Sequence, residues 1–224
     1  MGLVHFVYDT GVYKFSVTQS VYLVFKRLLD ILISFFSILL LFPLILFISF
    51  VIKFTSKGPV VFSQNRVGQY GKLIKIYKFR TMLSSAPNEV ATGDLENPDA
   101  YITKVGKILR MTSLDEILQF FNVLKGDMSI VGPRPIIFSE KEIHSLREKE
   151  NVYLIKPGIT GLAQINGRDL LTPKEKVRYD SFYMRRISLR MDIYILFKSV
   201  IVVLNRANFF EGRRKKDETL SKKD

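Results

Sequence analysis

The stretch ILISFFSILLLFPLILFISFVI, residues 31–52, carries no charged side chain. Its length is sufficient to cross a hydrocarbon core of roughly 30 Å. A secretory signal is excluded, because the apolar run is too long, begins too late and lacks a small-residue cleavage site. The sequence therefore predicts a membrane helix that the rest of the fold must accommodate.

Two interpretations of this helix are open from the residues alone. An ordinary single-pass helix fits its length. However, Pro43 lies near the middle, where it removes a backbone hydrogen bond and kinks the helix. Basic residues flank both ends, with Lys26 and Arg27 before and Lys53 and Lys57 after. Because this balance gives no orientation by the positive-inside rule, we favour a re-entrant hairpin that enters and leaves by the cytoplasmic face.

Composition limits the chemistry. The chain has 224 residues, 47% of them hydrophobic, with no cysteine and two histidines. Thiolate nucleophiles, disulfides and clustered histidine metal sites are therefore excluded or disfavoured. The formal net charge of +13 indicates an anionic partner: nucleic acid, anionic lipid or a phosphorylated substrate. No Walker, dinucleotide-binding, helix-turn-helix, zinc-finger or RNA-recognition motif is present, so nucleic acid is not the expected partner.

We expect an α+β fold, with a re-entrant membrane helix hairpin broken at Pro43 and then a small cytoplasmic, mainly helical domain with short strands and interfacial helices. The predicted boundaries are an N-terminal segment (1–25), the membrane helix (26–53), the domain that follows it (54–205) and a basic tail (206–224). Strands are predicted at 59–64 and 73–79, and helices at about 114–124, at 138–150 and, in two pieces, at 173–204. Residues 84–100 form a polar loop, and the last helix suits either the membrane interface or the core.

The stretch TSLDEIL (112–118) places Asp115 next to Glu116 at the start of an apolar helix. Ser113 and Glu116 have the spacing of a capping box, which is one explanation of the pair. Gln119 and Asn122 extend the polar strip for two more turns, either as a solvent-exposed face or as part of a site. The alternative explanation is that the carboxylates take part in chemistry.

Basic residues on turns accompany this pair. VGPRP holds Arg134 between two prolines, and a guanidinium with little freedom suits bidentate recognition of phosphate. Each cation alone is compatible with an ordinary surface charge, but together, beside paired carboxylates and a membrane anchor, they indicate a phosphate site. The candidate phosphate-binding residues are Arg110, Arg134, Arg168, Lys78 and Arg80. Phosphate substrates usually bring Mg²⁺, for which Asp115 and Glu116 are the candidate ligands.

Long consecutive motifs now point to one family. KRLLDILIS, the proline-broken apolar helix, GPVVFSQNRVG, IYKFRTM, LRMTSLDEILQFFNVLKGDMSIVGPRP and KPGITGLAQINGR occur in this order. The arrangement resembles the bacterial sugar transferases, the monotopic phosphoglycosyl transferases, from about Lys26 to Leu204. The size and single anchor are similar to the minimal form of that family. One departure is Phe42 before Pro43, where family members often carry serine.

The resemblance implies a reaction. A sugar-1-phosphate would pass from a nucleoside diphosphate sugar, usually a UDP-sugar, to a polyprenyl phosphate such as undecaprenyl phosphate, with release of UMP. Asp115 would be the nucleophile that forms a phosphosugar-aspartyl intermediate, and Glu116 would support the site through Mg²⁺. Arg110, Arg134 and Arg168 would hold phosphates or the dyad.

The resemblance also implies a place in the cell. The protein would be monotopic in the inner membrane, with its catalytic domain on the cytoplasmic face, at the first membrane step of a surface glycan or glycoconjugate pathway. Membrane lipid is an expected partner, and a homodimer is a further expectation. Two alternatives remain: a membrane-anchored basic scaffold, and a direct transfer in which Asp115 is a base or metal ligand.

Overall fold

The computed structural model describes residues 13–87, 97–167 and 170–204. Its N-terminal element is the 39-residue helix α1 (Val17–Thr55), which begins with a capping box formed by Ser16 and Gln19. In the described part of the chain, α1 is the one helix long and apolar enough to cross a membrane. The predicted membrane segment is therefore helical, and the helix begins nine residues earlier than 26, at Val17.

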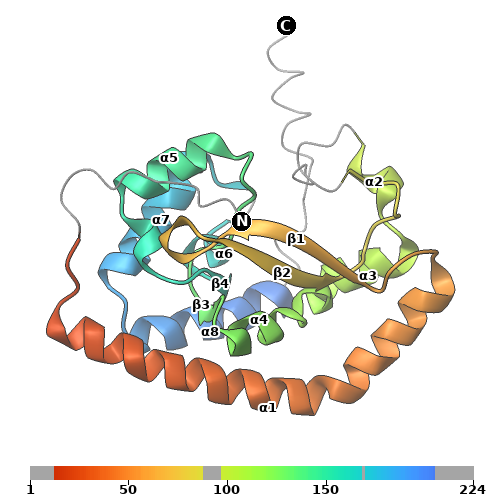
Figure 1. The fold of residues 1–224 in the computed structure, drawn as a ribbon, viewed down its shortest axis with the longest axis horizontal. Helices are drawn as coiled ribbons and strands as arrows, with labels where there is room; N and C mark the ends of the chain where they lie inside the picture. The colour runs from red at the N-terminus through yellow and green to blue at the C-terminus, as the bar shows by residue number, and fades with distance from the viewer. Residues whose placement is uncertain (1–12, 88–96, 168–169, 205–224) are drawn as a thin grey trace, which may run out of the picture.

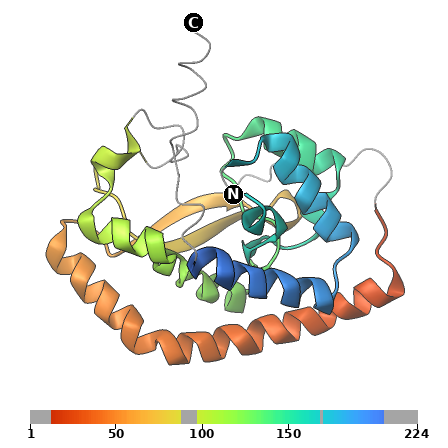
Figure 2. The same ribbon diagram turned by 180° about the vertical axis from the view of Figure 1, so that it is seen from behind.

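The expected break at Pro43 is wrong, because α1 is helical on both sides of this residue without interruption. Figures 1 and 2 show one long helix that curves along one side of the domain and bends in its orange, C-terminal part. A proline inside a helix removes one hydrogen bond and pushes the preceding turn away, which bends a helix that neighbouring turns still hold together. The segment expected to form a broken hairpin is thus a continuous, bent helix.

The rest of the chain combines short strands with short helices. Strands β1 (Val61–Val67) and β2 (Leu73–Phe79) form an antiparallel pair, and β3 (Ser129–Val131) pairs in parallel with β4 (Gly158–Thr160). The helices are α2 (Pro98–Tyr101), α3 (Lys104–Thr112), α4 (Gln119–Lys125), α5 (Lys141–Lys149), α6 (Leu162–Ile165), α7 (Pro173–Arg185) and α8 (Leu189–Leu204), and the 3₁₀ turns are η1 (Gln69–Gly71), η3 (Leu114–Glu116) and η4 (Val152–Leu154).

Most of the predicted elements are confirmed. Both early strands form, and the helices expected at 138–150 and 173–204 correspond to α5 and to α7 with α8. The mixed α+β class is therefore correct. The tail at 206–224 and the N-terminal residues 1–12 lie outside the described residues, as do 88–96 of the predicted polar loop.

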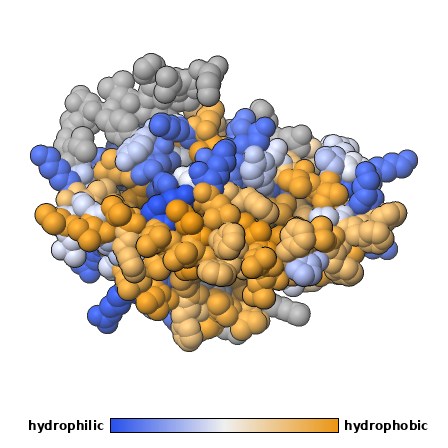
Figure 3. Space-filling model, turned by 60° about the horizontal axis from the view of Figure 1, so that its bottom comes forward, coloured by the Kyte–Doolittle hydropathy of each residue, from blue (hydrophilic) through white to orange (hydrophobic). Residues whose placement is uncertain are grey.

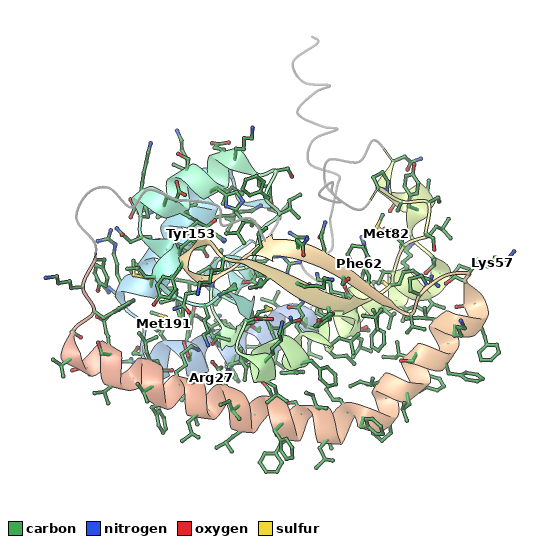
Figure 4. The ribbon with its side chains drawn as sticks, in the orientation of Figure 1. Arg27, Lys57, Phe62, Met82, Tyr153 and Met191 are labelled. Atoms are coloured by element: carbon green, nitrogen blue, oxygen red, sulfur yellow. The ribbon has the colours of Figure 1, made fainter. Side chains whose placement is uncertain are left out.

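Both ends of α1 are attached to the same domain. Near its start, Arg27 donates to the backbone carbonyl of Leu124 at the end of α4, at 2.9 Å. At its other end, Arg80 donates to the carbonyls of Ser56 and Lys57, at 2.8 and 2.9 Å. Figure 4 labels Arg27 and Lys57, which lie far apart along the helix and are both in contact with the domain. The helix therefore lies along the domain instead of leading away from it.

Two apolar clusters build the core. The larger lies between α4, β3, α7 and α8 and includes Val123, Met128, Tyr183, Met184 and Ile195, all nearly inaccessible to solvent. The second joins the C-terminal part of α1 to β2 and α3, and its buried residues include Ile48, Ile52, Phe79 and Leu109. Fully burying each such side chain contributes about 1.5–3 kcal/mol. The bent part of α1 is thus packed as a core helix on its inner face.

Asp192 at the start of α8 joins α1 to the domain through buried polar groups. Its carboxylate accepts from Lys26 Nζ at 2.5 Å, from the Tyr22 hydroxyl at 2.7 Å and from the Tyr183 hydroxyl at 2.7 Å. Burial beside Asp192 raises the pKa of Tyr183 well above its usual value, so its hydroxyl remains a donor. One turn after Lys26, Asp30 accepts from the backbone N–H of Ile130 at 3.0 Å. Lys26 and Asp30 of α1 therefore have partners in the domain.

The outer face of α1 is apolar and exposed. Figure 3 shows a broad hydrophobic surface over the side of the molecule along which this helix runs. Exposed apolar side chains on α8 add to those of the membrane helix. The exposed residues include Phe35, Phe36, Leu39, Leu40, Phe47 and Phe50 of α1, and Ile193, Phe197, Val200 and Leu204 of α8. An apolar area of this extent marks a membrane or protein contact.

The substitution Asp192→Ala should lower the free energy of unfolding by about 3–5 kcal/mol, because it leaves Lys26 buried without its carboxylate. Denaturant titration in detergent micelles measures this change. Glu150→Ala is the matched control, since it removes the carboxylate of the exposed pair with Arg185 and should cost below about 1 kcal/mol. Equal losses in the two variants would contradict the role given to Asp192.

Candidate active site

The two carboxylates lie on a tight turn between α3 and α4. Ser113 ends α3 with φ of 57° and ψ of 15°, in the left-handed region, and its side chain makes no capping bond. The chain then forms the 3₁₀ turn that carries Asp115 and Glu116, and α4 begins only at Gln119. The predicted capping box is therefore wrong, since a left-handed Ser113 points the chain away from the geometry of a helix cap. The pair is not explained by helix initiation.

Glu116 is bound by two cations from different elements. Its side-chain Oε1 accepts from Lys78 Nζ at 2.6 Å and from Arg134 Nη2 at 3.1 Å. Lys78 comes from β2, and Arg134 comes from the segment that follows β3. The residue is 8% exposed, whereas the adjacent Asp115 is half-buried on the same turn. Three predicted site residues are thus brought together beside Asp115.

Opposing effects act on the pKa of the Lys78 ammonium group. Burial lowers its pKa, and the neighbouring Arg134 acts in the same direction, whereas Glu116 and Asp115 act to raise it. The net change is a pKa below the ordinary value for lysine. The charged form of Lys78 is therefore favoured by the two carboxylates and opposed by burial.

Arg110 lies in the last turn of α3, close to the dyad in sequence. Its Nε donates to the Thr81 hydroxyl at 2.9 Å. This contact is possible because α3 approaches residue 81 closely at Gly106, where a Cβ atom would lie 2.0 Å from the Thr81 carbonyl oxygen. Arg110 is therefore held by the segment after β2. Thr81 was not predicted, and nothing in its sequence context distinguishes it.

The polar strip that follows the dyad is buried, not solvent-exposed. Asn122 is completely inaccessible, and its amide accepts from the Tyr77 N–H at 3.0 Å and donates to the Lys75 carbonyl at 2.7 Å. Gln119 is also buried. These two bonds attach α4 to the backbone of β2 on both sides of residue 76. Asn122 therefore fixes the strand that presents Lys78 to Glu116.

The hydrogen bonds of Arg80 go to the end of α1 and not to this cluster. Its guanidinium is buried at the end of α1, where it binds Ser56 and the Lys57 carbonyl. Strand β2, which carries Lys78, ends at Phe79, so Arg80 follows the strand. Arg80 therefore attaches the membrane helix, and Arg168 lies outside the described residues.

Further polar side chains on β1 approach the site. Phe62 pairs with Lys78 across the hairpin, and Gln64 and Arg66 follow at two-residue spacing. Arg66 Nη1 donates to the carbonyl of Pro135 at 3.4 Å, next to Arg134. The alternation within GPVVFSQNRVG is the signal that identifies this face. The sequence analysis did not assign these residues.

The carboxylates available for a metal are few. In residues 13–87, 97–167 and 170–204, no group of three or more histidine, aspartate or glutamate side chains could hold a metal ion. Mg²⁺ requires only one or two protein carboxylates when substrate phosphates complete its coordination. Asp115 and Glu116 meet this minimum, so the residues present fit a metal that binds together with a phosphorylated substrate.

The fold is thus one long apolar helix attached along an α+β domain, with a carboxylate pair bound by cations. The family profile of bacterial sugar transferases matches residues 21–206. The chain therefore belongs to the bacterial sugar transferase family.

Relatives with curated names are similar over most of this chain. A UDP-glucose:undecaprenyl-phosphate glucose-1-phosphate transferase of Klebsiella pneumoniae is 46% identical over 197 residues, which cover 83% of this chain and 41% of that protein. An undecaprenyl-phosphate galactose phosphotransferase of Salmonella typhimurium is 40% identical and covers 81% and 40%. The exopolysaccharide production protein ExoY of Rhizobium meliloti is 35% identical and covers 82% and 88%. The chain thus spans about two fifths of the length of the first two relatives.

The pKa of Lys78 should fall further in Glu116→Gln, because the carboxylate that favours the charged ammonium has been removed. In the unchanged protein this pKa should already lie below the model-peptide value of about 10.4. Competitive acetylation of lysines across a pH series, read by mass spectrometry, measures both values. Glu142→Gln, on the exposed side of α5, is the control and should leave the Lys78 titration unchanged. A higher pKa in Glu116→Gln would contradict the contact.

Proposed function

We propose that this protein transfers a sugar-1-phosphate from a UDP-sugar to a polyprenyl phosphate of the undecaprenyl phosphate type, with release of UMP. The observation that carries the proposal is the Glu116 carboxylate bound by Lys78 and Arg134 beside Asp115. The names of the relatives, which include UDP-glucose and undecaprenyl phosphate, support the substrate classes. The name of ExoY supports a role in exopolysaccharide production.

In the first proposed step, a carboxylate oxygen of Asp115 attacks the β-phosphorus of the UDP-sugar. An oxygen–phosphorus bond forms to Asp115, and the bond from that phosphorus to the bridging oxygen breaks. The bridging oxygen leaves with the electron pair as part of UMP. Asp115 then carries the sugar phosphate as an acyl phosphate, an activated species that divides one difficult transfer into two displacements.

In the second proposed step, an oxygen of the polyprenyl phosphate attacks the same phosphorus. The bond between phosphorus and Asp115 breaks, which restores the carboxylate and yields the polyprenyl-diphosphate sugar. A carboxylate is ionised at neutral pH, so Asp115 needs no histidine to activate it. His144, the histidine within the described residues, is buried, and its ring nitrogens contact Tyr153 and Ile137 and not the dyad.

The cationic side chains offset the electrostatic repulsion that this reaction involves. Two anionic substrates must approach an anionic nucleophile, and fixed positive groups reduce the repulsion. Arg134, Lys78 and Arg110 are the described cations that we assign to the phosphates. Glu116 holds the first two in place through its own charge. The same pair of bonds turns Glu116 away from the role of nucleophile, since its Oε1 is shared by two donors.

Asp115 and Glu116 would hold Mg²⁺ together with the donor diphosphate. When bound, the metal would neutralise charge on the diphosphate and on the leaving UMP. Lys78 and Arg134 would then keep the Glu116 carboxylate oriented. The carboxylates would hold the metal, Lys78 and Arg134 would orient Glu116, and the metal would add positive charge at the diphosphate to that of the cationic side chains.

We further propose that α1 is re-entrant and that the protein is monotopic in the inner membrane, with its domain on the cytoplasmic face. A straight 39-residue helix would be about 58 Å long, whereas the hydrocarbon core measures roughly 30 Å. Attachment of both ends of the helix to one domain supports entry and exit on the same side. The bend and the exposed apolar outer face support insertion into one leaflet.

Asp115→Asn should lower UMP release by about 10³-fold or more, because the amide cannot form the covalent intermediate. The assay uses a panel of UDP-sugars with undecaprenyl phosphate and Mg²⁺. Asp127→Asn, at the far end of α4, is the isosteric control and should retain turnover. A radiolabelled sugar phosphate should remain on the denatured protein when the acceptor is omitted, and this label should be absent in Asp115→Asn.

The same experiment separates the alternatives. UMP release that requires the acceptor, without label on the protein, would indicate direct transfer and overturn the covalent step. If neither protein released UMP from any donor and Asp115→Asn still supported the biological role of the protein in cells, the result would indicate a scaffold.

Single cysteines introduced at Lys14, Lys57 and Lys174 test the topology, and the absence of native cysteine makes the labelling specific. All three positions are exposed. A membrane-impermeant thiol reagent should label none of them in spheroplasts and all of them in inverted vesicles, because both ends of α1 lie on the cytoplasmic side. Lys174, on α7, marks the side of the domain. Opposite labelling at positions 14 and 57 would establish a helix that spans the membrane.

A further inference from the structure

The segment from Arg134 to Ile137 has a donor on each of its four successive backbone carbonyls. Its surroundings supply these donors from α5 and from the end of β1. The bonds are Arg147 Nη1 to Arg134 O at 2.9 Å, Arg66 Nη1 to Pro135 O at 3.4 Å, the Val67 N–H to Ile136 O at 3.0 Å, and His144 Nε2 to Ile137 O at 2.9 Å. We call the four donor residues the carbonyl clamp.

The two α5 members of the clamp are one helical turn apart and are themselves fixed. Arg147 is 3% exposed, and its Nε and Nη2 donate to Asp180 Oδ2 at 3.1 and 2.6 Å. His144 is 5% exposed, and its Nδ1 contacts the Tyr153 hydroxyl. The outer face of α5 is charged and exposed, with Lys141 and Glu142. Its inner face consists of these buried donors.

The tautomer of His144 follows from its partners. A backbone carbonyl only accepts, so Nε2 carries the proton toward Ile137, and Nδ1 accepts from the Tyr153 hydroxyl. Burial lowers the pKa of His144, which favours this neutral form. The imidazole thus acts as a fixed donor to the segment and not as a charge.

The clamped segment is also the one that carries a cation to the dyad. Pro133 and Pro135 restrict the backbone on both sides of Arg134. Before them, the N–H of Gly132 donates to the Thr160 carbonyl at 2.8 Å, which ties the segment to β4. From this held backbone, Arg134 Nη2 donates to Glu116 Oε1 at 3.1 Å.

We propose that His144 and Arg147 are positioning residues for the transfer reaction. They touch neither substrate nor dyad, and they act by holding the backbone from which Arg134 reaches the donor phosphates. This inference rests on the proposed function for its kinetic consequence. The clamp itself is a structural property that can be measured without turnover.

A purely structural role for α5 would have a different signature. Loss of packing would lower stability and would reduce activity equally whether or not Arg134 is present. A positioning role instead predicts that the loss is coupled to Arg134, because a displaced backbone matters only when that side chain is there to be misplaced.

The experiment compares His144→Leu, which removes the donor, with His144→Gln, whose amide can replace Nε2. Since a misplacement of about 1 Å can cost 10²-fold, His144→Leu should reduce kcat/KM for the UDP-sugar about 10- to 100-fold, and His144→Gln should restore most of it. Arg147→Lys tests the second donor, while keeping a charge beside Asp180. Arg185→Lys, in the exposed pair with Glu150, is the control and should change kcat/KM less than about two-fold.

The coupling to Arg134 is measured in the Arg134→Ala background under single-turnover conditions. There, His144→Leu should cause less than about a two-fold further loss. An equal loss in both backgrounds, or a failure of His144→Gln to recover, would overturn the positioning role.

Amide hydrogen exchange gives a readout that does not depend on transfer. In His144→Leu, exchange at Arg134, Ile136 and Ile137 should accelerate, while the amides of α7 remain as in the unchanged protein. Unchanged exchange in this segment would overturn the clamp even if the protein proved inactive with every donor. Inactivity of the unchanged protein, with accelerated exchange in the variant, would instead reject the proposed function and leave the clamp in place.

Discussion

The contact between Lys26 and Asp192 sets the arrangement on which the other elements depend. A helix that lies along a folded domain must find partners there for its buried charges, because an unpaired buried charge costs several kcal/mol. Asp192 supplies this partner at 2.5 Å and collects two tyrosine hydroxyls as well. Together with Arg80 at the other end of the helix, the contact fixes α1 relative to α4, and therefore relative to the dyad.

The side chains of the candidate site are positioned by residues outside the site, which hold the backbone segments that carry them. Asn122 attaches α4 to β2 and so presents Lys78, while α5 attaches to the segment that presents Arg134. The reacting carboxylate that we propose, Asp115, lies on a short turn next to a strained Ser113. A short turn exposes a side chain that a regular helix would keep on one face, and the surrounding layer keeps that turn in one conformation.

The sequence predicted the elements with strong local signals and missed the contacts between distant ones. Hydrophobic length identified the long apolar helix, alternation identified β1 and β2, and the paired carboxylates with their cations singled out Asp115, Glu116, Lys78 and Arg134, which lie together in the structure. Local pattern also misled, since Ser113 has capping spacing but a left-handed backbone. Asn122, Arg147 and the parallel pairing of β3 with β4 depend on neighbours far away in the chain, which no window of sequence contains.

The attachment of α1 also has a consequence for biosynthesis. Lys26 and Asp192 are separated by 166 positions, and chains elongate at about 5–20 residues per second, so the helix waits roughly 8 to 33 s for its partner to be made. During this interval the apolar helix has left the ribosome while α8 does not yet exist. With α1 inserted as we propose, the bilayer shelters it during this interval, and the domain then assembles on a helix that is already in the membrane.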